Sequence, residues 1–167
     1  WTDPDTQIVH FIGKDITYFH ALFWPAMLMG TGYTLPAQIA IHGMLTVNGE
    51  KMSKSRGTFI LADRFADFIS PEALRYYFAC KLSASIEDID LNFEDFVGRV
   101  NADLVNKIVN LVSRTVPLLH KNYVGKPTHA ARDLVAEVTA LAQNIEPSYR
   151  ARDTAQVVKN VVLIADR

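Results

Sequence analysis

The chain has a single cysteine, Cys80, among its 167 residues. One cysteine cannot form an internal disulfide, which excludes a disulfide-stabilised scaffold and favours a protein of the reducing cytoplasm. Because Cys80 lies in an apolar helical pattern with no histidine close by in sequence, we expect it to be a small buried side chain and not a nucleophile.

Long hydrophobic runs and a strong net charge are also missing. No apolar stretch reaches the roughly 20 residues that a membrane-spanning helix needs, and no signal peptide opens the chain. The formal net charge is only −1, so any contact with RNA must come from a local patch and not from a global field. With 49% hydrophobic and 21% charged residues, the composition is that of a folded soluble protein. The first residue is not methionine, and we expect the chain to be a piece of a longer polypeptide.

A basic segment at residues 51–57 carries the strongest functional signal. It reads Lys51-Met52-Ser53-Lys54-Ser55-Arg56-Gly57. Three cations interleaved with two hydroxyls indicate a loop that closes over a polyphosphate. No Walker-type glycine pattern precedes it, so side chains would hold a nucleotide more than a backbone nest would. A solvated basic surface turn is the alternative interpretation.

The residues before this segment predict a strand, a helix and a second strand. Residues 7–12 form a β-branched and aromatic run, residues 15–30 carry apolar side chains at helical spacing, and residues 38–47 form a second apolar run. Such a unit makes a right-handed parallel crossover. Ligands of parallel sheets bind beyond the carboxyl ends of the strands, where Gly13, Asp15 and the basic segment fall.

The rest of the chain is predicted to be helical, with a polar break at residues 83–90. The expected helices cover residues 63–69, a stretch that Ser70 and Pro71 open, residues 92–116, residues 128–144 and residues 154–167. We expect Pro117 to end the longest of them. The composition changes near residue 90 from mixed α/β to helix only, and we place a domain boundary there.

The basic segment and its flanks resemble the methionyl-tRNA synthetases of the bacterial type. Lys-Met-Ser-Lys-Ser is the signature loop of the class I aminoacyl-tRNA synthetases. The similarity includes Phe11–Ile16, Tyr18–His20, Leu22–Leu28, His42–Gly43, Thr46–Gly49, Asp90–Val97 and Arg99–Leu104, and it fades after about residue 116. The loop alone would also fit the tyrosyl, valyl, leucyl and isoleucyl enzymes, and the context of His20 and Trp24 favours methionine.

This resemblance implies an α/β fold and a division into three parts. Residues 1–62 would be the second half of the Rossmann-type catalytic domain with its signature loop, residues 63–91 a connecting stem-contact region, and residues 92–167 the first part of an all-α anticodon-binding bundle. The implied function is ATP-dependent activation of methionine to methionyl-adenylate and its transfer to tRNA(Met). The His-Ile-Gly-His type element and the zinc-bearing insertion of the family are absent, and no Cys-x-x-Cys is present. We therefore expect these residues alone to be inactive.

The resemblance also implies the site residues. Lys51 and Lys54 would be the catalytic cations. The expected ATP-binding residues are Gly13, Asp15, His42, Leu45, Lys51, Met52, Ser53, Lys54 and Ser55. The expected methionine-binding residues are Ile16, Phe19, His20 and Trp24, and Asn110 and Arg114 would meet the tRNA anticodon. Magnesium is expected with the ATP, held mainly by phosphates and water, because no carboxylate cage is visible.

Simpler interpretations stand beside these assignments. Asp15 could cap a helix, His20 could be a satisfied core histidine, and Trp24 could be plain core packing. Asn110 and Arg114 could belong to a solvated helix face. At the level of the whole chain, the alternatives are a related synthetase for another apolar amino acid and a noncatalytic tRNA-binding module derived from the enzyme.

Overall fold

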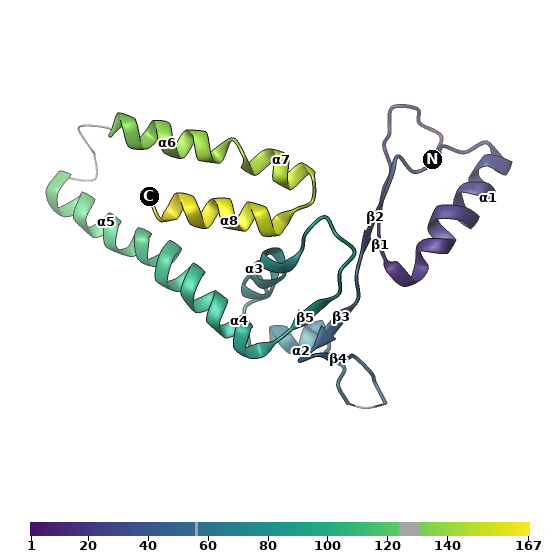
Figure 1. Ribbon diagram of the computed structural model, residues 1–167, viewed down its shortest axis with the longest axis horizontal. Coiled ribbons are helices and arrows are strands. Elements are labelled where there is room, and N and C mark those ends of the chain that lie inside the picture. The colour runs from purple at the N-terminus through teal and green to yellow at the C-terminus, as the bar shows by residue number, and fades with distance from the viewer. Residues whose placement is uncertain (56, 124–130) are drawn as a thin grey trace. The chain divides into compact units, whose positions relative to one another are not determined.

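The computed structural model describes residues 1–55, 57–123 and 131–167 (Figure 1). The chain divides into two compact units, and each is described by itself. The first unit comprises residues 1–51 together with residues 85–90, and the second comprises residues 52–84 together with residues 91–167. Arg56 of the basic segment and the start of the helix expected at 128–144 lie outside the described residues.

A parallel pair of strands forms the centre of the first unit. Strand β1 (Val9–Gly13) pairs with β2 (Gln38–His42) in a register that places Gly13 opposite His42. The connection begins with helical segments, a 3-10 turn η1 (Lys14–Ile16), a π-helical turn η2 (Phe19–Phe23) and the helix α1 (Trp24–Thr31), and residues 32–37 then lead into β2 without helical structure. The predicted strand, helix, strand unit is therefore confirmed, with the strands parallel.

A second sheet of three strands has the order β4-β3-β5. It consists of β3 (Leu45–Val47), β4 (Glu50–Lys51) and β5 (Ile89–Leu91). Strands β3 and β4 are antiparallel, and the turn between them has positive φ at Asn48 (49°) and Gly49 (79°), as a tight hairpin requires.

The prediction of one strand over residues 38–47 was wrong. The run is broken at residues 43–44, and its second half joins the other sheet. Gly43 is buried, and a Cβ there would lie 2.1 Å from the Glu87 carbonyl oxygen. The break thus occurs where a segment from much later in the chain packs directly on the backbone. Strand β5, which belongs to that later segment, was not predicted.

The second unit is helical. Its elements are α2 (Ala62–Ala66), α3 (Pro71–Lys81), α4 (Phe93–Arg99), the π-helical η3 (Val100–Val109), α5 (Asn110–Tyr123), α6 (Arg132–Ala142), α7 (Ile145–Arg150) and α8 (Thr154–Ala165). The predicted helix start at Ser70 is confirmed, since the amide of Glu72 donates to Ser70 Oγ (3.3 Å), and Asn92 caps α4, where the amide of Asp95 donates to Asn92 Oδ1 (2.9 Å). Figure 1 shows α8 running back along α7 and α6, and it also packs on α3.

Pro117 lies inside α5, so the predicted helix end there was wrong. Proline removes one amide donor and leaves the carbonyl four residues earlier without its helical partner. Every residue from Leu111 to Leu118 is exposed, so solvent can hydrogen-bond that carbonyl on this surface. The helix therefore continues past the proline to Tyr123.

The buried side chains are distributed unequally between the units. Phe65, Tyr77, Leu91 and Phe96 belong to the second unit, and Ile12 and Leu28 to the first. Tyr77 is fully buried, with its ring 5.4 Å from that of Phe96. In the first unit, large apolar side chains of η2 and α1 remain more than half exposed, among them Phe19, Leu22, Phe23 and Met27. This surface is apolar without being covered by the described residues.

Candidate functional site

Three of the predicted nucleotide-binding residues meet at the carboxyl ends of β1 and β2. Gly13 and His42 are register partners at the last position of each strand. A Cβ on Gly13 would lie 2.7 Å from Asp15 Oδ1 and 3.9 Å from His42 Cε1. Asp15 lies in the first turn of η1, and the N-cap residue of this turn is Gly13 and not Asp15. Its carboxylate is exposed, as an acceptor for an incoming hydroxyl would be.

The imidazole of His42 is held by its own strand end. Its Nδ1 lies 2.9 Å from the carbonyl oxygen of Gly43. A carbonyl accepts only, so Nδ1 carries the proton, and in the neutral ring Nε2 is then an acceptor. Leu45 follows as the first residue of β3 and is half-buried. Between them, Gly43 leaves room for the Glu87 carbonyl oxygen, which lies 2.1 Å from where a Cβ would be.

His20 and Trp24 lie in one row of aromatic rings. The His20 ring meets that of His10 edge to face at 5.7 Å, and Trp24 meets Trp1 at 5.6 Å. Trp1 also contacts His10, with 6.1 Å between the ring centroids. His20 Nδ1 lies 3.0 Å from the Ile16 carbonyl oxygen, so this nitrogen is the donor and Nε2 of the neutral ring is an acceptor.

Phe19 belongs to a different aromatic group. Its ring stacks on Phe23 at 5.8 Å and meets Tyr18 at 6.4 Å. Phe19 and Ile16 are exposed, whereas His20 and Trp24 are half-buried. The structure therefore brings His20 and Trp24 together but does not place Phe19 in the same row.

Two residues of the aromatic row, Trp1 and His10, were not predicted from the sequence. His10 is the second residue of β1, and its Nδ1 is buried without a hydrogen-bond partner in the described part of the chain. The strand pattern alone identified residue 10 as a strand position. Its contact with a helix residue ten positions later depends on how the crossover folds back, which no local pattern reports.

The described residues of the basic loop are held by their own hydrogen bonds. The Ser53 amide donates to Thr58 Oγ1 (3.0 Å), and the Thr58 amide donates to the Ser53 carbonyl oxygen (3.2 Å). Gly57 has φ of +70°, and its amide donates to the Lys54 carbonyl oxygen at 3.3 Å. The Lys54 ammonium lies 5.3 Å from the centroid of the Phe59 ring, a cation–π contact. Lys51 is the last residue of β4, and Met52, Ser53, Lys54 and Ser55 follow it.

Asn110 and Arg114 are one helical turn apart and therefore share a face of α5. Arg114 is exposed, and Asn110 is half-buried. The Asn110 amide nitrogen donates to the Asn106 carbonyl oxygen at 3.3 Å, which leaves its side-chain oxygen as an acceptor.

A charged network joins α3 to the start of the long helix. Asp95 accepts from Lys81 Nζ (2.6 Å), from the Tyr77 hydroxyl (3.0 Å) and from Arg99 Nε (3.0 Å). The Lys81 bond, assisted by Tyr77 and Arg99, holds the pKa of the Asp95 carboxyl below its usual value. Ion pairs thus fix the start of the helical stretch that runs through α4 and η3 into α5, which carries Asn110 and Arg114.

The comparisons with known proteins decide the family. A family model for class I tRNA synthetases (M) matches residues 1–116. The chain belongs to this synthetase family. It is 53% identical to the methionine–tRNA ligase of Thiobacillus denitrificans over 99% of its own length and 24% of that ligase. The synthetase chain thus spans about a quarter of this curated relative.

Solved structures of Mycobacterium tuberculosis methionyl-tRNA synthetase match the fold. One, in complex with methionyl-adenylate, has a TM-score of 0.84 and 32% identity over 95% of this chain and 32% of that chain. The free-state structure has a TM-score of 0.80 and 28% identity over 95% of this chain and 31% of that one. The predicted resemblance to methionyl-tRNA synthetases is confirmed, and the fold is that of a class I synthetase with mixed α/β and mostly helical content.

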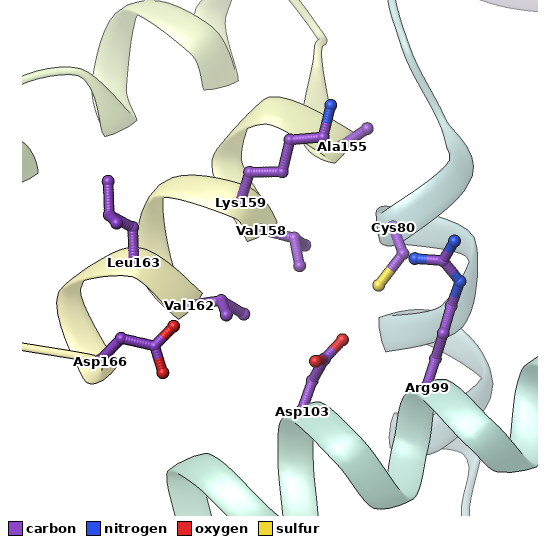
Figure 2. Close-up of a pocket in the computed structure, with 9 residues that line it drawn as sticks. All are labelled: Cys80, Arg99, Asp103, Ala155, Val158, Lys159, Val162, Leu163 and Asp166. Atoms are coloured by element: carbon purple, nitrogen blue, oxygen red, sulfur yellow. The ribbon is translucent and has the colours of Figure 1, made fainter.

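The second unit of this synthetase chain also holds a cavity of about 270 Å³. Figure 2 shows Val158 and Val162 of α8 facing Cys80 and Asp103 across it. None of the predicted site residues lines this cavity. Cys80 was expected to be buried but is half-buried at the edge of this cavity. Desolvation by its surroundings raises the pKa of the Cys80 thiol.

No cluster of three or more histidine, cysteine, aspartate or glutamate side chains that could hold a metal ion was found among the described residues. None of the helices in the described ranges has the length and apolar character needed to cross a membrane.

Proposed function

We propose that the chain is part of a methionine–tRNA ligase, which activates methionine with ATP and transfers it to tRNA(Met) in the cytoplasm. Residues 1–62 would be the second half of its Rossmann-type domain, residues 63–91 the connecting region, and residues 92–167 the start of its anticodon-binding bundle. The observation that carries the proposal is the meeting of Gly13, Asp15 and His42 at the ends of two parallel strands. The similarity to Mycobacterium tuberculosis methionyl-tRNA synthetase in complex with methionyl-adenylate supports it.

The strand ends would bind the nucleoside part of ATP. Gly13 would let the backbone approach the ribose, because glycine has no side chain that stands in the way. The exposed Asp15 carboxylate would accept hydrogen bonds from the ribose hydroxyls. His42 and Leu45 would lie beside the base, with the Gly43 turn between them held by the Glu87 backbone.

The aromatic row of η2 and α1 would recognise the methionine side chain. A thioether is polarizable and weakly polar, so aromatic rings and one hydrogen-bonding group can separate it from leucine. His20 and Trp24 offer this combination, with the imidazole orientation set by the Ile16 carbonyl. Ile16 and Phe19 would complete the wall from the same helical stretch.

Lys51 and Lys54 would act on the phosphates, together with hydroxyl and amide groups of Met52, Ser53 and Ser55. The methionine carboxylate attacks the α-phosphorus, the bond to the β-phosphate oxygen breaks, and pyrophosphate leaves with the developing negative charge. Cations at that position stabilise the transition state more than the ground state. Magnesium, bound mainly by phosphates and water, would neutralise further charge when ATP is present. In the second reaction a terminal ribose hydroxyl of the tRNA attacks the carbonyl carbon, and AMP leaves.

The exposed face of α5 would meet the anticodon. The Asn110 amide can read a base edge, and the Arg114 guanidinium can stack on a base or pair with a phosphate. Their separation by one helical turn allows both to contact one short single-stranded segment.

The test is aminoacylation by the full-length protein with a panel of amino acids. We expect charging of tRNA(Met) with methionine, and much weaker charging with leucine, isoleucine or valine. If the protein charges tRNA preferentially with another amino acid, that amino acid and not methionine is its substrate. Binding of tRNA without any charging would identify a noncatalytic tRNA-binding module.

A further inference from the structure

Residues 85–90 form a strap across the ends of β2 and β3. They come much later in the chain than these strands but belong to the same compact unit. The Glu87 carbonyl packs where a Cβ of Gly43 would be, and the Ile89 amide donates to the Met44 carbonyl oxygen at 2.9 Å. The strap therefore touches the backbone that joins the two strands.

Asp88 of the strap joins two segments that carry nucleotide-site residues. Its Oδ1 accepts from the Met44 amide at 2.7 Å and from Lys14 Nζ at 2.6 Å. Met44 immediately precedes Leu45, and Lys14 immediately precedes Asp15. The bond from Lys14, followed by that from Met44, holds the pKa of Asp88 below its usual value, so the carboxylate is ionised at neutral pH. The Asp88 carboxylate thus binds the residue before Asp15 and the residue before Leu45.

Asp90 makes the corresponding contact at the start of the basic loop. Its Oδ1 accepts from Thr46 Oγ1 at 2.6 Å and from the Gly49 amide at 2.7 Å. Gly49 is the second left-handed residue of the tight turn between β3 and β4. The chain passes from this turn through Lys51 directly into the loop. Asp90 thus fixes the point from which the loop leaves the sheet.

We infer that Asp88 and Asp90 are positioning residues of the activation reaction, with separate tasks. Asp88 holds the groups that bind the nucleoside, and Asp90 holds the base of the loop whose lysines act on the pyrophosphate. The inference rests on the proposed function. In it, the strap residues act without touching the substrate, by holding the segments that do.

The separate tasks predict different kinetic defects in the full-length protein, measured by methionine-dependent exchange of pyrophosphate into ATP. Asp88→Ala should raise KM for ATP about tenfold, with KM for methionine changed less than about twofold, because a charge-assisted bond is lost on the nucleoside side only. Asp88→Asn keeps an acceptor for the Met44 amide and should recover part of the loss.

Asp90→Ala should instead lower kcat about tenfold with little change in either KM, because the loop lysines act mainly in the transition state. Asp90→Asn retains one acceptor oxygen and should be intermediate. Glu87→Ala is the matched control, since the Glu87 side chain makes no hydrogen bond or ion pair within the described ranges, and its kinetics should equal those of the wild type.

Hydrogen exchange on the same proteins gives a readout independent of activity. Asp88→Ala should speed exchange at the Met44 amide and leave the Gly49 amide protected, and Asp90→Ala should do the reverse.

Two results would overturn the inference while the proposed function stands: both variants behaving as Glu87→Ala does, or both changing every kinetic constant in parallel with a lowered melting temperature. A wild-type protein without methionine-dependent exchange would overturn the proposed function and this inference with it.

Discussion

At the scale of single residues, Lys54 has the most specific task. Lys54→Ala in the full-length protein should slow adenylate formation by an amount equivalent to about 2 to 4 kcal/mol, since it removes a charge that stabilises the departing pyrophosphate. Binding of methionine should change little. Pyrophosphate exchange kinetics measure both, and Lys121→Ala, an exposed lysine near the end of α5, is the control. Unchanged turnover with a raised KM for methionine would show that Lys54 does not act on the departing pyrophosphate.

His20 and Trp24 determine amino-acid choice in this account. Replacing either by alanine should raise KM for methionine and reduce discrimination against leucine and norleucine, by about 1 to 3 kcal/mol for a reshaped apolar pocket. Dependence on the anticodon should be unaffected. Met29→Ala, on the same helix and 70% exposed, should behave as the wild type. Unchanged selectivity in both variants would mean that the aromatic row is ordinary packing.

Most of these residues were predicted from the sequence, because their neighbours in the chain carry the signal. Gly13, Asp15 and the loop were expected at strand ends from hydrophobic patterns alone, and the register of Gly13 with His42 agrees with that expectation. Trp1 and His10 were missed because their contacts with Trp24 and His20 arise only when the crossover folds back. The aspartates of the strap were missed for the same reason: their partners lie in segments distant in sequence.

At the scale of elements, α5 is expected to serve tRNA and not activation. Asn110→Ala or Arg114→Ala should impair charging of tRNA while methionine-dependent pyrophosphate exchange stays nearly unchanged. Arg114 should also carry part of the salt dependence of tRNA binding. Thr115→Ala, on a neighbouring exposed position, is the control. Full anticodon discrimination in both variants would remove α5 from the interface.

The ion-pair network that starts this helical stretch should make the second unit sensitive to acid. The folded pKa of Asp95 is lowered, by Lys81 first, so its stabilisation is present above its unfolded pKa of about 4 and is lost as the pH falls through the folded value. Asp95→Asn should lower the free energy of unfolding by about 1 to 2 kcal/mol at pH 7 and by less in acid. Chemical denaturation at several pH values tests this, with the exposed Asp67→Asn as control. A pH-independent difference would contradict the assignment.

Helix starts were easier to predict than helix ends and strand breaks. Ser70 and Asn92 cap helices through local hydrogen bonds that the sequence displays. Pro117 was misjudged because solvent can satisfy the carbonyl that the proline leaves unpaired, and the exposure that allows this is a tertiary property. The strand break at Gly43 occurs where the strap packs on the backbone, far along the chain. The apolar run at residues 38–47 therefore carries no local sign of the break.

At the scale of the whole molecule, the two units differ in how well their apolar side chains are buried. The second unit closes around Tyr77 and Phe96, whereas the first leaves much of η2 and α1 exposed. Parallel sheets are ordinarily covered on both faces. The matched ligase and the solved synthetase chain are much longer than this chain. It aligns with 24% of the ligase and with 32% of the solved chain. We therefore propose that these residues supply one half of an active site.

Methionine-dependent exchange of pyrophosphate into ATP, measured side by side for the full-length protein and the 167-residue chain, tests this claim most directly. The full-length protein should catalyse exchange with methionine, and the isolated chain should show none, because its lysines have no nucleotide positioned for them. Exchange by the isolated chain would show that the His-Ile-Gly-His half is dispensable. Absence of exchange in the full-length protein would contradict the account as a whole.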